Sequence, residues 1–391
     1  MKVISLKDVF EKPITGEWGS EDVNGSGIPV IRTANFTDEG KIDYSNLITR
    51  VIEEKKASKK YLKKFDIIIE KSGGSDNKPV GRVVFFDGPD DTYLFNNFAA
   101  VLRVKDPKEI CPQYVFYYML QLYTRFGTQR YENKTTGIHN LKLENLLQKE
   151  VLPLITYEEQ INIVHQLQAI RNVIDIRRTQ LILLNNLVKS RFVEMFGDPV
   201  NNTKNLPNLT LPQLGIFGRG VSKYRPRNAP KLLGGPYPLI QTGDVSGAGL
   251  YITKYENTYS EMGLKQSKMW PAGTLCITIA ANIAKTAILT FDACFPDSVV
   301  GFHSNGKTNN IFIHYWFLFF QKILEKQAPE SAQKNINLKI LNELKVIVPP
   351  IKKQMDFAAF VSQIDKSRLL FKCQLLQYYN IEHIIRGRNY G

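Results

Sequence analysis

Two long stretches of the chain carry apolar residues at alternating intervals of four and three positions. One stretch lies between Glu158 and Phe196 and the other between Gln354 and Ile385, and neither contains Gly or Pro. This spacing places the apolar residues on one face of a helix, and over about four heptads it is typical of helices that pair lengthwise. We therefore predict two long helices that pair through Ile163, Leu167, Ile170, Ile174, Leu181, Leu184, Val188, Phe357, Val361, Ile364, Phe371, Leu375 and Tyr378. A pair of separate amphipathic core helices is the alternative.

The same order of features occurs twice along the chain. Ile31-Arg32-Thr33-Ala34-Asn35 resembles Ile240-Gln241-Thr242-Gly243-Asp244, and His139-Asn140-Leu141-Lys142-Leu143 resembles Ile336-Asn337-Leu338-Lys339-Ile340. A proline-containing turn and a glutamine precede each long helix, as Pro153 with Gln160 and as Pro349 with Gln354. Several matches in one order indicate an internal duplication.

Short β-rich runs and one aromatic-rich helix are predicted in each half. The runs are bounded by Gly, Pro and Asn turns and comprise residues 67–70, 82–86 and 99–104 in the first half, and 275–280 and 287–291 in the second. The helices are expected at residues 114–122 and 314–324, and we interpret the apolar run at 311–320 as a buried helix because it is too short to span a bilayer.

The expected fold is therefore α+β, with two globular domains separated by two long antiparallel coiled-coil helices that form a pseudo-two-fold repeat. The boundaries follow from the pattern: a first globular domain at 1–157, a spacer helix at 158–200, a second globular domain at 201–346 and a second spacer helix at 347–391.

The charge of the chain indicates a polyanionic partner. The formal net charge is +14, which favours nucleic acid. Residues 1–157 are nearly balanced, with 23 basic and 21 acidic side chains, whereas residues 201–345 hold 16 basic and 8 acidic side chains. The densest basic cluster is Arg219 with residues 223–227. In the first half, the lysines between Lys55 and Lys64 suggest a helix-like basic face, and Lys71-Ser72-Gly73-Gly74 suggests a nest of backbone amides that could bind an anion.

No catalytic or metal-binding pattern is found. The five histidines are scattered, the four cysteines stand singly, and no phosphate-binding loop with a Lys-Ser ending is present. The isolated cysteines fit a reducing compartment, and the polar N-terminus does not resemble a signal peptide. We expect a cytoplasmic, non-enzymatic protein with no metal site and no cofactor of its own.

The residues resemble the specificity subunit of type I restriction-modification enzymes over essentially the whole chain. The resemblance rests on the duplicated order of domain and helix, on Pro153 to Gln160 with its altered copy Pro349 to Gln354, and on the helix-closing run Lys189 to Pro199. It also rests on residues 222–228 followed by 240–244. The second copy differs from the usual motif at Lys352-Lys353, where acidic residues are common.

The resemblance implies a division of labour among subunits. Each globular domain would be a target recognition domain that reads one half of an asymmetric, bipartite site on double-stranded DNA, and the helix pair would set the spacing. Two methyltransferase subunits would methylate adenine with S-adenosylmethionine, and two motor-nuclease subunits would use ATP and Mg²⁺ for restriction. This chain would contribute no catalysis and contact no membrane.

We expect DNA contacts in the polar loops where the two repeats coincide. In the first half they are Lys71, Ser72, Gly73, Ser75, Lys78, Arg82, Lys134, Thr135, Thr136, His139 and Asn140. In the second half they are Lys223, Tyr224, Arg225, Arg227, Asn228, Asn282, Lys285, Gln333, Lys334 and Asn335. Two other functions stay open at this point: a self-sufficient DNA nuclease, and a coiled-coil adaptor without sequence-specific DNA binding.

Overall fold

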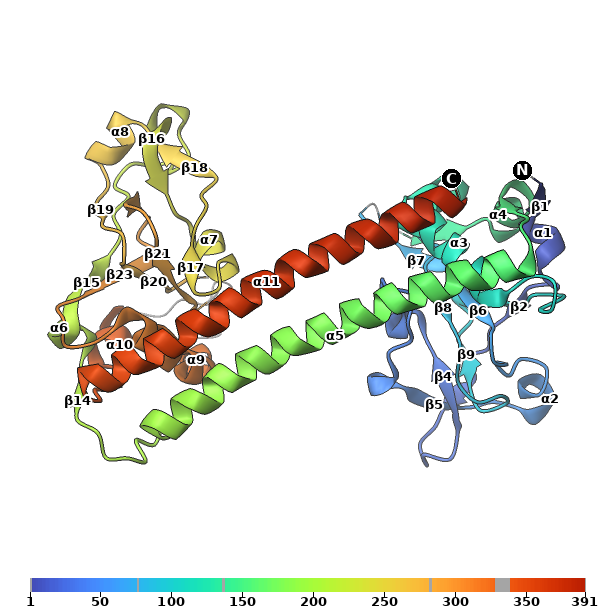
Figure 1. The fold of residues 1–391 in the computed structure, drawn as a ribbon, viewed down its shortest axis with the longest axis horizontal. Coiled ribbons are helices and arrows are strands. Elements are labelled where there is room, and N and C mark those ends of the chain that lie inside the picture. Colours follow the sequence, from blue (N-terminus) through green and yellow to red (C-terminus); the bar gives the residue numbers. More distant parts are fainter. Residues whose placement is uncertain (1, 76, 136–137, 281–282, 328–337, 391) are drawn as a thin grey trace. The chain divides into compact units, whose positions relative to one another are not determined.

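The computed structural model describes residues 2–75, 77–135, 138–280, 283–327 and 338–390, and the chain is a mixture of helices and sheets (Figure 1). It divides into two compact units. Unit 1 comprises residues 1–178 and 373–391, and unit 2 comprises residues 179–372. The division runs within the two long helices, so each helix contributes one segment to each unit.

Unit 1 is built on small sheets whose strands come from distant parts of the sequence. An antiparallel sheet has the order β2-β10-β6-β8, formed by Ile14–Thr15, Ala99–Leu102, Ile67–Glu70 and Val83–Phe85. A second sheet has the order β3-β5-β4-β9, formed by Ser20–Glu21, Ile48–Val51, Ile28–Ile31 and Leu94–Phe95. A third has the order β11-β12-β7, formed by Glu132–Thr135, Ile138–Leu141 and Ser72–Gly74. The helices are α1 (Leu6–Val9), α2 (Glu54–Ala57), α3 (Pro112–Thr124) and α4 (Leu143–Lys149).

Unit 2 repeats most of the strand order of the first two sheets, with β17 and β19 added at edges and no counterpart of β3. Its larger sheet is β15-β23-β20-β21-β17, formed by Gly215–Arg219, Val299–Ser304, Leu275–Thr278, Thr286–Leu289 and Tyr251–Ile252. The other is β18-β16-β22-β19, formed by Asn257–Tyr259, Leu233–Leu239, Ala293–Cys294 and Met269–Trp270. In each unit the second sheet contains one parallel pair, β4 with β9 or β16 with β22, and its other pairs are antiparallel. In the larger sheet of unit 2, β17 and β21 are also parallel. The helices are α6 (Leu211–Leu214), α7 (Thr242–Gly247), α8 (Glu261–Lys265), α9 (Asn310–Gln327) and α10 (Leu338–Glu343).

The repeated segments 31–35 and 240–244 form the same hydrogen-bonded turn at the end of β4 and of β16. The Arg32 amide donates to Asn35 Oδ1 at 2.9 Å, and the Gln241 amide donates to Asp244 Oδ2 at 2.7 Å. Both side chains cap the short helical turn that follows the strand. The expected strands are confirmed as β6, β8, β10, β20 and β21; β6 has the predicted bounds, and no end of the other strands shifts by more than two residues.

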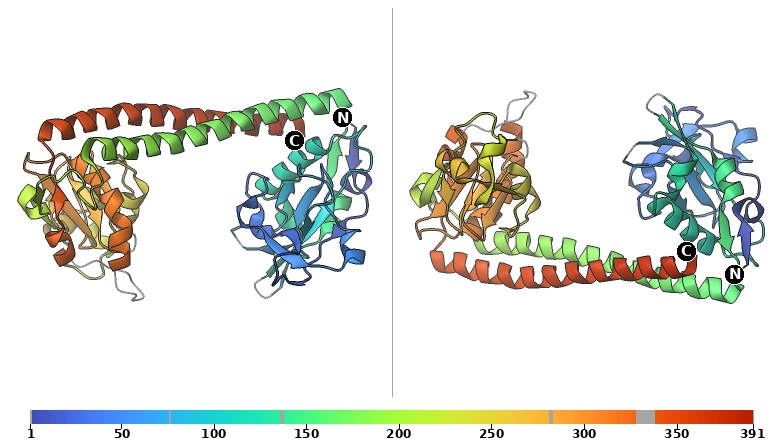
Figure 2. Two further views of the ribbon diagram at one scale, coloured as in Figure 1. Left: turned by 90° about the horizontal axis from the view of Figure 1, so that it is seen from below. Right: turned by 90° about the horizontal axis from the view of Figure 1, so that it is seen from above.

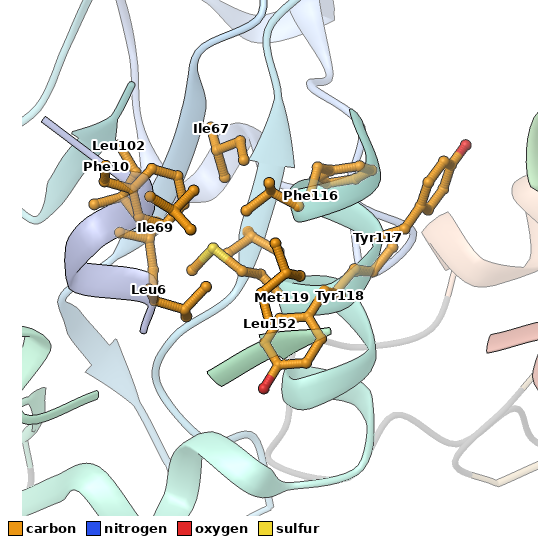
Figure 3. Close-up of a cluster of buried hydrophobic side chains, with 14 of the residues drawn as sticks. Leu6, Phe10, Ile67, Ile69, Leu102, Phe116, Tyr117, Tyr118, Met119 and Leu152 are labelled. Atoms are coloured by element: carbon orange, nitrogen blue, oxygen red, sulfur yellow. The ribbon is translucent and has the colours of Figure 1, made fainter. Parts of the chain in front are cut away.

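The core of each unit lies between the sheet and one aromatic-rich helix. α3 packs on β8 and α9 packs on β21 (Figure 2). In unit 1, Phe116 and Met119 of α3 face Ile67 and Ile69 of β6, and Leu6 closes the cluster (Figure 3). α9 is the expected buried helix, and Phe312, Trp316 and Phe317 are fully buried. Among the described residues, every helix is too short or too polar to cross a lipid bilayer.

The two long helices are α5 (Tyr157–Phe196) and α11 (Ile351–Tyr390), each of 40 residues and about 60 Å long at 1.5 Å per residue. None of the predicted seam residues is exposed: Ile163, Leu167, Ile174, Val188, Phe357, Val361 and Leu375 are buried, and Ile170, Leu181, Leu184, Ile364, Phe371 and Tyr378 are half-buried.

The helix segments within each unit run antiparallel. In unit 1, Arg171 Nε bonds Glu382 at 2.8 Å, and the Arg178 guanidinium lies 5.6 Å from the ring of Tyr379. In unit 2, the rings of Phe192 and Phe357 lie 5.4 Å apart. The seam also packs against the domains, because Ile163 and Leu167 belong to the core of unit 1, whereas Val188, Phe357 and Val361 belong to that of unit 2.

Each long helix is fastened to its unit by a buried glutamine in its first turns. Gln160 Oε1 accepts from the Cys111 amide at 2.8 Å, and its Nε2 donates to the carbonyls of Glu109 and Ile155 at 3.2 and 3.1 Å. Gln354 Oε1 accepts from the Asn309 amide at 2.9 Å, and its Nε2 donates to the Pro349 carbonyl at 2.8 Å. Each glutamine thus joins the start of a long helix to the residue that precedes α3 or α9.

We expect Gln160→Ala to lower the free energy of unfolding of unit 1 by about 2 kcal/mol, because it leaves the buried Cys111 amide and the partly buried carbonyls of Glu109 and Ile155 without this partner. Denaturant unfolding followed by circular dichroism measures the change. The matched control is Gln166→Ala, an exposed position on the same helix, which should change stability by less than about 0.5 kcal/mol. Equal midpoints for the two variants would contradict the role of Gln160.

A second prediction concerns His314 of α9. Burial lowers its pKa to about 4, and its Nδ1 lies 2.9 Å from Thr286 Oγ1. Since the ordinary pKa is 6.5, the unfolded chain binds the proton first, and stability should fall as the pH falls from about 6.5 to about 4. His314→Gln, which cannot titrate, should show a shallower decline in melting temperature over that interval. The exposed His165→Gln should behave as the wild type, and a wild-type slope in His314→Gln would contradict the prediction.

Candidate nucleic-acid interface

The sheet β11-β12-β7 of unit 1 brings together two separate segments in which the sequence predicts DNA contacts. β12 pairs with β7 so that Asn140 stands opposite Ser72, and Ser72 Oγ donates to Asn140 Oδ1 at 2.7 Å. Lys134 and Thr135 lie on β11, the other neighbour of β12. Segments more than 60 residues apart therefore form one polar surface.

Two residues of unit 1 that were predicted to contact DNA bond instead to other groups of the protein. Arg82 donates from Nε and Nη2 to the carboxylate of Glu70, both at 3.0 Å, and to the carbonyls of Thr33 and Phe36, both at 3.1 Å. His139 is 7% exposed and its Nδ1 lies 3.0 Å from Glu132 Oε2. In the structure both side chains brace the framework behind the surface.

Lys71 lies at the edge of this surface, half-buried. Its Nζ donates to Thr15 Oγ1 at 3.4 Å. Burial, and then the charge of Lys60, lower the pKa of Lys71. A bound phosphate would offset the cost of burying the Lys71 ammonium group.

The expected nest of backbone amides at residues 71–74 does not form as predicted. The amides of Lys71 and Ser72 both donate to the carbonyl of Phe98, at 2.7 and 3.3 Å, because the segment continues from β6 into β7. The helix-like basic face between Lys55 and Lys64 is also wrong: α2 ends at Ala57, and Lys60 turns back to form an ion pair with Glu17 at 2.8 Å.

In unit 2 the basic cluster lies on an exposed segment between β15 and β16. Lys223, Tyr224, Arg225, Arg227 and Asn228 are all exposed. Arg225 Nη1 donates to the carbonyls of Ser222 and Tyr224, at 2.5 and 3.0 Å. Asp297 forms ion pairs with both Arg225 and Arg227, so the two guanidinium groups lie next to one carboxylate.

The predicted DNA-contact residues of the two units lie next to turns that occupy equivalent places in the two folds. In unit 1 the β9–β10 turn (Asn96–Ala99) is closed by the Ala99 amide on the Asn96 carbonyl at 3.1 Å. In unit 2 the β22–β23 turn (Pro296–Val299) is closed by the Val299 amide on the Pro296 carbonyl at 3.0 Å. The carbonyl of Phe98 accepts from Lys71, as that of Ser298 accepts from Ile279 at 3.1 Å. Lys71 and Ser72 thus adjoin the first turn, and Arg225 and Arg227 adjoin the second.

Sequence reasoning missed the turns themselves. Asn97 and Phe98 are exposed in unit 1, and Asp297 carries the arginines in unit 2. A signal was present: Phe95-Asn96-Asn97 and Phe295-Pro296-Asp297 occur 200 residues apart, and each directly precedes an apolar strand.

The other residues predicted to contact DNA are scattered or lie outside the residues that the structure describes. Lys78 pairs with Asp38 at 3.0 Å, and Ser75 forms a bridge with Lys78. Lys285 Nζ reaches Gln321 of α9 at 3.3 Å. Thr136, Asn282, Gln333, Lys334 and Asn335 lie outside the described residues. In the described part of the chain, no three His, Cys, Asp or Glu side chains are grouped as metal ligands.

A family model for the type I restriction modification DNA specificity domain matches residues 1–186 and 217–377. The chain belongs to this family. It is 22% identical, over 93% of its length and 86% of the relative, to the MjaX type I restriction enzyme specificity subunit of Methanocaldococcus jannaschii.

Solved structures share the fold. One, from a study of complex assembly and conformational transition of the type I R-M system, has a TM-score of 0.61 at 16% identity and covers 100% of this chain and 97% of that one. Another, a type I restriction-modification S subunit from M. genitalium, has a TM-score of 0.60 at 14% identity, with coverage of 100% and 96%.

The family resemblance predicted from the sequence is thus confirmed. The chain is a type I specificity subunit, a non-catalytic DNA-recognition protein that works in complex with other subunits and DNA.

We expect Arg227→Ala in this specificity subunit, assembled with its partners, to weaken DNA binding and to reduce the slope of log affinity against log salt by about 1, the value for one lost phosphate contact. Titrations of a labelled duplex at several salt concentrations measure both quantities.

Arg191→Ala is the matched control for this substitution. Arg191 lies on α5 of the same unit, paired with Glu194, with a side-chain exposure of 41% against 44% for Arg227. The control should leave affinity and slope unchanged. Equal effects of the two substitutions would show that the segment beside Asp297 does not contact DNA.

Proposed function

We propose that this specificity subunit reads an asymmetric, bipartite site on double-stranded DNA, with one half-site bound by unit 1 and the other by unit 2. The observation that carries the proposal is the pair of equivalent turns in the same framework. They bear different side chains, Asn97 and Phe98 in one and Asp297 and Ser298 in the other, and their polar neighbours also differ. Two like frameworks with unlike polar surfaces read two different sequences.

In this proposal the long helices set the interval between the half-sites. Both are uninterrupted over 40 residues, their seam residues are buried or half-buried, and their segments within each unit run antiparallel. They would therefore act as an antiparallel coiled coil that relates the two domains by a pseudo-two-fold axis. An interval fixed by paired helices would translate into a fixed number of base pairs between the half-sites.

Partner subunits supply the chemistry in this proposal. Two methyltransferase subunits carry S-adenosylmethionine and methylate an adenine in each half-site after flipping it from the duplex. Two motor-nuclease subunits hold ATP and Mg²⁺ and restrict unmodified DNA. Large apolar side chains exposed along the helices support the presence of partners, since such surfaces usually mark protein contacts; Ile182, Leu183, Leu369 and Leu376 are 60%, 58%, 65% and 66% exposed.

The test combines partner recovery with a map of methylated adenines. Affinity purification of the tagged chain from its native cells should recover a DNA methyltransferase at about two copies per chain. Deletion of the gene should abolish adenine methylation at one motif that consists of two unlike parts separated by a fixed spacer. Reintroduction of the wild-type gene should restore it.

The variant Arg225→Ala with Arg227→Ala should relax or abolish recognition in one part of the motif only, because both residues belong to unit 2. A continuous motif, a motif unaffected by the deletion, or a purified chain that cleaves DNA by itself would each overturn the proposal.

A further inference from the structure

The β9–β10 turn of unit 1 presents an aromatic ring to solvent beside the polar surface described above. Phe98 is 51% exposed, whereas Phe95, Asn96 and Ala99 are each no more than 3% exposed. A single exposed apolar residue is ordinary on a protein surface. Phe98 differs from an ordinary one in the way its backbone is held and in the groups that flank it.

The backbone of the turn is fastened from several sides. Besides the two amides that donate to the Phe98 carbonyl, the Asn96 amide donates to the Ile31 carbonyl at 3.0 Å, which ties the turn to the end of β4. Gly16 approaches so closely that a Cβ there would lie 2.1 Å from the Asn96 carbonyl oxygen. A ring on so constrained a turn loses little conformational freedom when it enters a partner.

The flanking groups are those of a nucleic-acid surface. Phe98 is bonded through its backbone to Lys71 and Ser72, and Ser72 is bonded to Asn140 of β12. Asn97, the next residue of the turn, is exposed and offers both a donor and an acceptor, the combination that pairs with an adenine edge. An exposed apolar ring on a turn whose bonded neighbours carry hydroxyl and ammonium groups suits contact with bases beside a phosphate backbone.

We propose that Phe98 acts as a wedge that inserts its ring between adjacent base pairs of the half-site bound by unit 1, while Asn97 contacts a base edge at the same step. The inference rests on the proposed function and adds the residue through which unit 1 distorts its half-site. Proteins that insert apolar side chains between base steps unstack them and bend the duplex. Unit 2 has Ser298 at the equivalent position and inserts no ring between the base pairs of its half-site.

The wedge makes the half-site of unit 1 sensitive to deformability as well as to base edges. Pyrimidine–purine steps unstack at the least cost, so the step entered by Phe98 is of this kind. The specificity at that step arises from the ease of opening and does not require a hydrogen bond.

The experiment uses the complete complex and duplexes that carry 2-aminopurine at single positions across both half-sites. The fluorescence of this base rises when it is unstacked. A rise is expected in both half-sites at the flipped adenine and the bases beside it. We expect a further rise at one separate step in the half-site of unit 1 and no such further rise in that of unit 2. Phe98→Ser copies the residue found in the equivalent turn of unit 2, so the turn should still form; it should abolish this further rise, leave the rise at the flipped adenines and weaken specific binding about tenfold.

Phe65→Ala is the matched control. Phe65 is 44% exposed and precedes β6, whereas Lys71 and its contact with Phe98 follow the other end of that strand. The control should keep both the fluorescence signal and the affinity. Melting curves of all three proteins establish that the units are folded.

The outcomes separate this inference from the proposed function. Bipartite binding by the wild type without the further rise in the half-site of unit 1, or with that rise unchanged in Phe98→Ser, would overturn the wedge and leave the bipartite reading intact. A wild-type complex that does not discriminate between the bipartite site and random DNA would overturn both.

Discussion

The position of each recognition framework on the long helices depends on one buried amide side chain. Gln160 and Gln354 are 1% and 0% exposed, and each bonds to the backbone immediately before an aromatic-rich helix. A buried amide satisfies its donors and acceptor only in one orientation. The start of α5 or α11 is thereby fixed relative to α3 or α9, which packs on the sheet that ends at the candidate DNA surface.

The two units keep one backbone framework and stabilise it with different side chains. Asp66 accepts from Arg103 at 2.8 Å in unit 1, where Thr274 meets His303 in unit 2. The Glu382–Arg386 pair on the last turns of α11 corresponds to Val188 and Phe192 on α5. Buried ion pairs add little net stability over apolar substitutes, so the choice between them is not dictated by the fold. The difference does make the end of α11 in unit 1 chemically distinct from the end of α5 in unit 2. Each helix end therefore fits its own unit better than it would fit the other.

Local patterns could be predicted from the sequence, and contacts between distant segments could not. The strand at Ile67–Glu70, the seam of the long helices and the cap at Asn35 and Asp244 all depend on residues within a few positions of one another. The failed nest at Lys71 depended on Phe98, which lies outside any local window, and its carbonyl took the amides that the nest required. Similarly, nothing near Arg82 in the sequence indicates that Glu70 and two carbonyls occupy its guanidinium group. Of the candidate site, the sequence located the polar segments but not the turns where they converge.

At these turns, the groups that hold the fold differ from the groups that face solvent. The hydrogen bonds that hold the β9–β10 and β22–β23 turns join backbone groups: Phe98 or Ser298 accepts through its carbonyl, and the turn closes from amide to carbonyl. The exposed side chains therefore contribute nothing to closing the turn, and they can differ as much as phenylalanine and serine at a single equivalent position. The framework behind them is set by buried residues such as Gln160 and Glu70. If these side chains contact DNA as proposed, a change of DNA sequence preference would require new side chains on a fixed backbone rather than a new fold. Under the proposed function, that property would allow one architecture, used twice in one chain, to read two unlike half-sites.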